Sequence, residues 1–359
     1  MTRVPPTHAV LDRSLVPELG ASIPPLGDPR PGTATGVGSL PHRSAGEAAR
    51  FAFAEYDLPA IPSLPRRSPA ESMIAQAAVG IEGITAGQYG SLAVDARRVD
   101  PEAPAVTDLS GDGFRGMRAF LHCARANGYE GPVKWQFVGP VTLGVTLTRA
   151  GLPDELAFAV AARAVRSHLA AISATVALAL PRSAQLITID EPWFGELLSP
   201  GFPIAPEPAI DLLSGAMAAV SGRGTVGIHC CARVDVASVL AAGPDVISLP
   251  GHPALANVAG YLGSFLGDGG RIAWGVVPTD GPLSLSVGRS WHQLHELWSV
   301  LVQRGVDADA LRTRSLVTPH CGMGTHSPAV AERVCRTTRE VGRRLAGWTP
   351  DARAPRGFA

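Results

Sequence analysis

The sequence predicts an α/β protein of the (β/α)8 TIM-barrel class, folded as a single domain. Short apolar runs alternate with longer helix-like segments along most of the chain, and eight of these runs are typical of strands. A chain of 359 residues, of which 46% are hydrophobic, is large enough for one such barrel. No Gly-x-Gly-x-x-Gly motif follows the first run, so a doubly wound sheet is the second choice.

The eight apolar runs have the composition of parallel strands covered by helices. Each is apolar almost throughout rather than alternating with polar residues, as expected when both faces of a sheet are buried. The strands are expected at residues 34–40, 58–63, 133–139, 186–190, 225–230, 246–249, 271–277 and 315–319.

Helices are expected between most of these strands. Ser44 followed by Glu47 is a capping-box pattern and predicts the start of the first helix. Apolar residues then recur at helical spacing, or alanines accumulate, in several longer segments. The helices are expected at residues 44–56, 153–180, 234–243, 288–305 and 327–347.

The two ends of the chain look different from the middle. Residues 1–32 are rich in proline and glycine and are expected to form an extended arm, and residues 349–359 a frayed tail. The barrel is expected to span residues 33–348. A further loose stretch is expected at residues 95–113.

The composition argues against several classes of partner. Thirty-one basic residues balance 31 acidic ones, and aromatic residues make up only 6%, so neither nucleic acid nor an anionic membrane surface is expected as a partner. No apolar run reaches the roughly 18 residues that span a bilayer, and the N-terminus lacks a secretory signal pattern. Five cysteines do not make a disulfide framework, so we expect a cytoplasmic protein.

Polar and titratable residues gather where five of the predicted strands end. They are Ser39, Asp190 with Glu191, His229 to Cys231, Asp280, and His320 with Cys321. In a (β/α)8 barrel the carboxyl ends of the strands meet at one face, and that face carries the active site. These residues are therefore expected to converge there.

The stretch His229-Cys230-Cys231 indicates a metal site. Side chains alternate along a strand, so His229 and Cys231 share the inner face while Cys230 points into the core. Cys321 comes from the last strand, and one imidazole with two thiolates suits Zn²⁺ with an open fourth position. The alternative is that these thiols are inert core residues, as we expect for Cys123 and Cys335.

Two further residues are candidates for substrate binding. Asp190 continues the inner face of its strand and has the charge to hold a substrate ammonium group; the alternative is a loop acid that caps the next helix or pairs with an arginine. Ser39 follows Gly38 and offers a hydroxyl and an N–H to a carboxylate; the alternative is an ordinary turn serine.

Several stretches together resemble one known family. They follow one another in the order "GVGSLP" (36–41), "VGPVTL" (138–143), "ITIDEP" (187–192), "IHCC" (228–231), "DVISL" (245–249), "WGVV" (274–277) and "PHCGMGT" (319–325). The ordered set, spread over residues 33–345, resembles the catalytic barrel of cobalamin-independent methionine synthase. That family lies in a wider superfamily with uroporphyrinogen decarboxylase.

The resemblance implies a zinc-dependent transfer of a methyl group to a thiol, with homocysteine as the first candidate acceptor. It places the zinc ligands on His229, Cys231 and Cys321. It also implies that Gly38 and Ser39 contact the amino acid substrate, and that Asp190 contacts its amino group.

The chain departs from the family pattern at three places. The zinc-binding glutamate that closes an Ile-Ser-x-Glu run is replaced by Pro250, so His252, Cys230 or a water is left to complete the metal site. The stretch after the second strand, "PSLPRRSPAE", has no clear substrate-binding glutamate. Asp280 stands where the family has a histidine proposed to move a proton.

These departures leave the methyl donor open between a folate and a methyl-corrinoid protein. A folate-type leaving group needs a general acid, and Asp280 is the candidate. Arg66 and Arg67 are candidates for binding an anionic substrate, or else are solvated surface residues. The alternative functions are a metal-free barrel resembling uroporphyrinogen decarboxylase, acting on a carboxylated substrate, and a barrel that binds a ligand without catalysis.

Overall fold

A parallel sheet of seven strands forms the centre of the protein. The computed structural model describes residues 26–87, 91–280 and 285–349. The strand order is β1-β9-β8-β7-β6-β5-β4, so neighbours along the chain are neighbours in the sheet from β4 to β9. The strands are β1 (Thr33–Ala34), β4 (Val133–Val138), β5 (Gln185–Asp190), β6 (Thr225–His229), β7 (Val246–Pro250), β8 (Arg271–Val277) and β9 (Ser315–Pro319).

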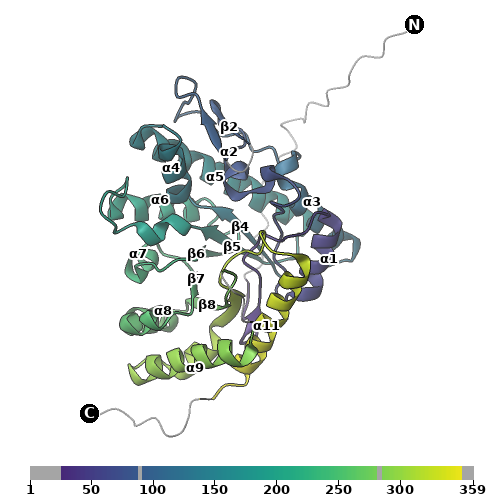
Figure 1. Cartoon of the computed structure of the whole chain (residues 1–359), viewed down its shortest axis with the longest axis vertical. Coiled ribbons are helices and arrows are strands. Elements are labelled where there is room, and N and C mark those ends of the chain that lie inside the picture. The colour runs from purple at the N-terminus through teal and green to yellow at the C-terminus, as the bar shows by residue number, and fades with distance from the viewer. Residues whose placement is uncertain (1–25, 88–90, 281–284, 350–359) are drawn as a thin grey trace.

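The sheet is curled, and helices cover its outer side. In Figure 1, β4 to β8 follow one another through the middle of the molecule, and α4, α6, α7, α8 and α9 follow in the same order outside them. The helices are α1 (Ala45–Glu55), α2 (Met73–Ala78), α3 (Arg115–Ala126), α4 (Pro140–Arg149), α5 (Asp154–Ala179), α6 (Pro206–Ala218), α7 (Val236–Ala241), α8 (Ala259–Gly267), α9 (Val287–Gln303), α10 (Ala308–Thr313) and α11 (Pro328–Ala346).

The prediction of a TIM-barrel-like α/β fold is confirmed at this level, but the second of the eight predicted strands does not form. Residues 58–63 make only isolated parallel bridges. Leu58 and Ser63 pair with Thr35 and Ser39 at one edge of the sheet, and Ala60 pairs with Lys134 at the other. Pro59 and Pro62 interrupt the segment, and a proline has no N–H to donate to a ladder. The sheet is therefore not closed by a continuous eighth strand.

The first predicted strand is also shorter than expected. Its ladder ends at Ala34, and the chain then meets β9 and the 58–63 segment through single contacts. Gly38 has a φ of 154°, and a Cβ on it would lie 2.1 Å from the side chain of Gln136. Only glycine fits this approach.

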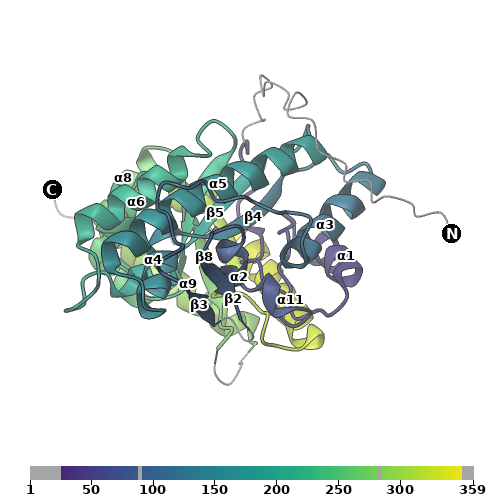
Figure 2. The same ribbon diagram turned by 90° about the horizontal axis from the view of Figure 1, so that it is seen from above.

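The predicted helices are present, with ends shifted by one or two residues. Ser44 accepts a hydrogen bond from the backbone N–H of Glu47 at 3.3 Å and so caps α1 as expected. The loose stretch 95–113 contains no helix before a short 3-10 turn at Asp112–Phe114. A two-stranded hairpin, β2 (Ile84–Ala86) and β3 (Leu92–Val94), was not expected from the sequence; it lies beside α2 (Figure 2).

Helix α5 is long and apolar enough, by length and composition, to cross a membrane. However, 56% of its most apolar 18-residue window is buried inside the protein. Ala157, Ala161 and Val165 on one face are fully buried. This is the packing expected of a core helix.

The inner face of the sheet changes from apolar to polar along the strands. Leu58, Leu186, Val246 and Leu316, near the beginnings of their segments, form one buried apolar cluster. Two and four residues further along β5, the same face carries Thr188 and Asp190. On β5, polar side chains therefore face the interior toward the carboxyl end of the strand.

The predicted terminal segments are described only in part. Residues 1–25 of the arm and 350–359 of the tail lie outside the described residues. Leu26 packs in the apolar cluster just defined, and Trp348 packs against Trp298 of α9 with ring centroids 4.9 Å apart.

Candidate metal centre

His229, Cys231 and Cys321 lie together at the carboxyl ends of the strands. One ligand atom from each, an imidazole nitrogen and two sulfurs, lies within 4.8 Å of the others. His229 ends β6, Cys231 follows two residues later on the same face, and Cys321 follows β9. Residues 92 positions apart in sequence thus meet because β6 and β9 end at the same face of the sheet.

Ser248 orients the imidazole of His229. The two residues are paired across the β6–β7 ladder, and Nδ1 of His229 lies 2.9 Å from the hydroxyl oxygen of Ser248. The other ring nitrogen, Nε2, is buried and has no hydrogen-bond partner among the described residues. A metal-bound histidine characteristically has one nitrogen held by such a polar partner while the other binds the ion.

The two thiols interact directly. A hydrogen bond between them lowers the pKa of Cys231, although burial opposes this effect. The same hydrogen bond and burial raise the pKa of Cys321, while nearby His229 opposes the rise. The two sulfurs thus lie close enough to share one proton. Two thiolates that bind the same cation need a similar closeness.

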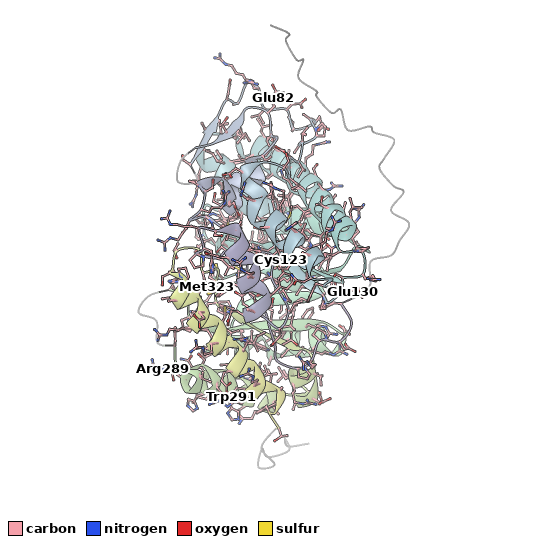
Figure 3. All side chains as sticks on the ribbon, turned by 90° about the vertical axis from the view of Figure 1, so that its right-hand side faces the viewer. Glu82, Cys123, Glu130, Arg289, Trp291 and Met323 are labelled. Atoms are coloured by element: carbon pink, nitrogen blue, oxygen red, sulfur yellow. The ribbon has the colours of Figure 1, made fainter. Side chains whose placement is uncertain are left out.

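The other cysteines lie outside this cluster, as the sequence predicted. Cys230 is fully buried on the opposite face of β6, and burial raises its pKa to about 11. Cys335 is buried in α11, and Cys123 is carried by α3 (Figure 3). Cys230 therefore does not complete the cluster.

His252 does not complete it either. Its Nδ1 accepts a hydrogen bond from the backbone N–H of Ala254, and its Nε2 contacts the guanidinium of Arg233. Pro250 lies on the same face of β7 as Ser248, opposite Cys231 if the parallel pairing of His229 with Ser248 is extended by two residues. The position of the expected fourth ligand thus adjoins the cluster, and the proline there has no donor atom.

Asp190 lies next to His229 in the β5–β6 ladder. Its Oδ1 is buried without a hydrogen-bond partner among the described residues. Burial raises the pKa of Asp190, and the opposite charges of His229 and Lys134 counteract the rise. The carboxylate thus has an oxygen free to bind a group that enters from the mouth of the sheet.

Glu191 caps the N-terminus of α4, a helix that precedes β5 in the chain. Its carboxylate accepts hydrogen bonds from the backbone N–H groups of Val141 and Thr142 and from the Thr142 hydroxyl, at 2.9, 2.7 and 2.6 Å. These groups belong to the first turn of α4, whose positive dipole end favours a carboxylate. The next helical segment after Asp190, the 3-10 helix Pro192–Glu196, has no side-chain cap hydrogen bond, so the capping alternative considered for Asp190 does not hold.

Burial of Glu191 makes the stability of the protein depend on pH. Burial raises its pKa from 4.5 to about 7, so the folded protein keeps a proton that the unfolded chain releases. The free energy of unfolding is therefore expected to fall by about 3 kcal/mol as the pH rises from about 4.5 to about 7, and then to level off. Urea denaturation at several pH values measures this.

The control is a comparison of two variants. In Glu191→Gln this part of the pH dependence should disappear, whereas in Glu155→Gln, which changes an exposed carboxylate of α5, it should remain. Equal pH dependence of the wild-type protein and Glu191→Gln would contradict the assignment.

Ser39 holds the loop that carries Cys321. Its hydroxyl accepts a hydrogen bond from the N–H of Gly324 at 3.2 Å, and its carbonyl accepts one from Met323 at 2.8 Å. A Cβ on Gly322 would lie 2.1 Å from the Ser39 hydroxyl oxygen. Ser39 is thus more than a turn serine, because it fixes the segment after β9.

Lys134 and Gln136 of β4 form a buried polar pair close to Gly38, which the sequence analysis did not identify. The ammonium of Lys134 donates to the carbonyl of Val37 at 2.8 Å and to the side chain of Gln136 at 3.2 Å. The Gln136 amide donates to the carbonyl of Ile61. Burial lowers the pKa of Lys134 to about 8, while Asp190 opposes the shift. These contacts join β4 to the segment that lacks a ladder.

The remaining predicted site residues lie further out. Arg66 is exposed and donates to the backbone carbonyl of His326. Arg67 is paired with the fully buried Glu71 at 2.6 Å and with Asp112 at 2.8 Å. Asp280 is exposed, but it lines the same cavity as Cys231 and Cys321.

Comparison with known proteins shows similarity only at the level of structure. No protein-family model and no curated protein sequence matches the chain. A B12-independent methionine synthase from Shewanella sp. W3-18-1, solved with selenomethionine, has a TM-score of 0.56 and 14% identity, over 89% of this chain and 98% of its own. A putative vitamin-B12-independent methionine synthase from Listeria monocytogenes has a TM-score of 0.52 and 17% identity, over 89% and 99%. This chain therefore shares their fold.

Proposed function

We propose that the protein is a zinc-dependent methyltransferase that acts on a thiol acceptor, with homocysteine as the first candidate. The observation that carries the proposal is the convergence of His229, Cys231 and Cys321. The unpartnered Nε2 of His229 and the two adjacent sulfurs form a donor set that fits zinc. The fold shared with two methionine synthase structures agrees with this function.

Zinc in this position supplies the activation of the acceptor, because a thiol that binds it loses its proton and becomes a nucleophile near neutral pH. Other side chains of the protein would hold the ligands in position. Ser248 keeps Nε2 of His229 directed at the cluster, and Ser39 keeps Cys321 in place through its contacts with the following loop. The protein thus holds three ligands before any substrate arrives.

The acceptor would be oriented by groups at the same end of the strands. The free oxygen of Asp190 suits an ammonium group, and the Gly38–Ser39 segment offers polar groups to a carboxylate. Arg66 is a more remote candidate for an anionic group. Asp280, on the cavity beside the thiols, would protonate a leaving group that needs a proton.

The proposal also covers the architecture of the site. We infer that residues 33–348 act as one barrel, in which the 58–63 segment takes the place of the eighth strand between β1 and β4. Closing the ring there would put the Gly38–Ser39 segment across the mouth of the barrel from His229.

Cobalt substitution tests the proposed function. The protein loaded with Co²⁺ is expected to bind about one ion per chain and to show thiolate-to-metal absorption. Homocysteine should increase this absorption, because its sulfur adds a third thiolate, whereas methionine, which has no ionisable thiol, should leave it unchanged. Absence of metal binding, or a spectrum that homocysteine does not alter, would contradict the proposal.

A further inference from the structure

A cavity of about 560 Å³ opens beside the two candidate metal-binding thiols. It is bounded by the loop after β6, by the end of β7 with the 3-10 helix that follows (Pro253–Val258), and by the segments after β8 and β9. Its size is that of a site for a small organic molecule. Neither Ser39 nor Asp190 lines it, so it is separate from the polar groups assigned to the acceptor.

The walls of this cavity are mainly apolar. Leu249, Leu255 and Val258 form one side, and Val234 and Val236 the other. Pro250 lines the cavity together with the thiols, and it is on the face of β7 from which a glutamate side chain would project toward the cluster. With proline there, the cavity and the thiols adjoin without an intervening charged side chain.

The charged groups around the cavity favour a cation. Asp235 and Asp280 contribute two negative charges and Arg233 one positive charge, a balance of −1 with the histidines left aside. Arg233 is exposed and turned toward His252, and Asp235 also caps α7 by accepting from Ser238. A ligand that combines an apolar body with one positive charge matches these walls.

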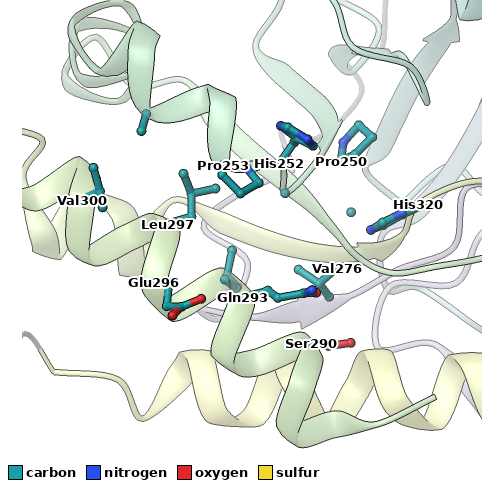
Figure 4. A pocket seen from close by; sticks show the side chains of 14 residues that line it. Pro250, His252, Pro253, Val276, Ser290, Gln293, Glu296, Leu297, Val300 and His320 are labelled. Carbon is teal, nitrogen blue, oxygen red and sulfur yellow. The ribbon is translucent and has the colours of Figure 1, made fainter. Parts of the chain in front are cut away.

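A second cavity, of about 320 Å³, shares Pro250, His252 and His320 with the first (Figure 4). Its remaining walls come largely from α9, including Leu297 and Val300, and neither candidate metal-binding thiol lines it. Of these two cavities, only the larger one borders the candidate metal-binding thiols.

We propose that the larger cavity binds the methyl donor, and that the donor is a small sulfonium compound with an apolar body. This inference rests on the proposed function. The acceptor thiolate attacks the methyl carbon, a new sulfur–carbon bond forms, and the methyl–sulfonium bond breaks with its electron pair going to the donor sulfur. A neutral thioether leaves, and no proton is needed.

The apolar walls suit this reaction for a physical reason. An anion and a cation react to give two neutral products, so charge disappears in the transition state. Water stabilises the separated ions more than the products, and a mainly apolar cavity weakens that stabilisation. A folate donor, in contrast, is polar, and its leaving amine requires a proton.

Binding to the metal-free full-length protein tests the site. Calorimetry with benzyldimethylsulfonium and with its uncharged isostere isobutylbenzene should show binding of both, the sulfonium about three- to fivefold tighter because of the adjacent carboxylates. Ala254→Trp, which places an indole at the rim of the cavity, should weaken both by at least about tenfold, since it takes up the space for the phenyl ring. Asp280→Asn should weaken only the sulfonium.

Two variants serve as controls. Ala241→Trp adds the same side chain at an exposed position of α7 outside the cavity and should leave both affinities unchanged. Val234→Phe fills the cavity from the opposite loop and provides a second blocking variant if Ala254→Trp unfolds. Undetectable sulfonium binding, or binding that neither blocking variant weakens, would overturn the inference.

Turnover separates this inference from the proposed function. With zinc and homocysteine added, the sulfonium should be converted to benzyl methyl sulfide, and Ala254→Trp should slow the conversion. If a methylfolate methylates homocysteine and the sulfonium does not, the donor assignment is wrong and the proposed function stands. If the protein takes up no zinc, the proposed function fails whatever the cavity binds.

Discussion

Replacing Cys231 with alanine is expected to reduce the zinc content of the purified protein from about one ion per chain to less than about a tenth. The variant keeps only His229 and Cys321, and two ligands do not hold zinc against dilution and chelators. Methyl transfer to homocysteine should be lost with the metal. Metal analysis after gel filtration, together with a colorimetric zinc assay during thiol titration, measures the effect.

Cys123→Ala is the matched control for this experiment. Cys123 is a partly buried cysteine on α3 and does not belong to the cluster, so its removal should leave the zinc content unchanged. Cys321→Ala should behave like Cys231→Ala. Retention of a full equivalent of zinc in both cluster variants would exclude the proposed metal centre.

Replacing Pro250 with glutamate is expected to tighten zinc binding by at least about tenfold, because a ligand in direct contact should contribute no less than an outer partner does. The position lies on the inner face of β7, two residues after Ser248, and adjoins the cluster. A carboxylate there would take the fourth coordination position. Competition with a zinc chelator of known affinity measures the change.

The same variant should bind thiols less well, because the carboxylate occupies the position that the acceptor sulfur needs or repels it. Pro253→Glu, which changes an exposed proline of the following 3-10 helix, is the control and should alter neither property. If Pro250→Glu leaves zinc affinity unchanged, residue 250 does not face the ion.

Strand alternation and parallel topology were enough to predict the centre of the site from sequence. His229 and Cys231 share a face because they are two residues apart on a strand, and Cys321 reaches them because β6 and β9 end together. The same alternation correctly placed Cys230 in the core. These inferences need only the type and direction of each strand.

Contacts that depend on register could not be predicted in the same way. Ser248 meets His229 only because the β6–β7 ladder pairs those two residues, and nothing in the local sequence fixes that offset. Likewise, Glu191 reaches the start of α4 across the sheet, and Lys134 reaches Val37 across the gap in the ladder. In the sequence, these residues are recognisable only as polar residues within or next to apolar runs.

The predicted strand at residues 58–63 shows that an apolar composition alone does not predict a continuous ladder. Residues 58–63 are as apolar as the other runs, and this predicted a strand. The two prolines remove the donors on which a ladder depends, so the segment follows the path of a strand with single bridges only. In a short run, the number of available N–H groups matters more than hydrophobicity.

The contact between Ser39 and Gly324 joins positions 285 residues apart. On the ribosome, a nascent chain cannot make this contact before Gly324 has emerged, well after β6 has been synthesised. Until then only His229 and Cys231 of the proposed ligand set have been made. A metal held by all three residues, as proposed above, would therefore load only after the segment that follows β9 has been synthesised.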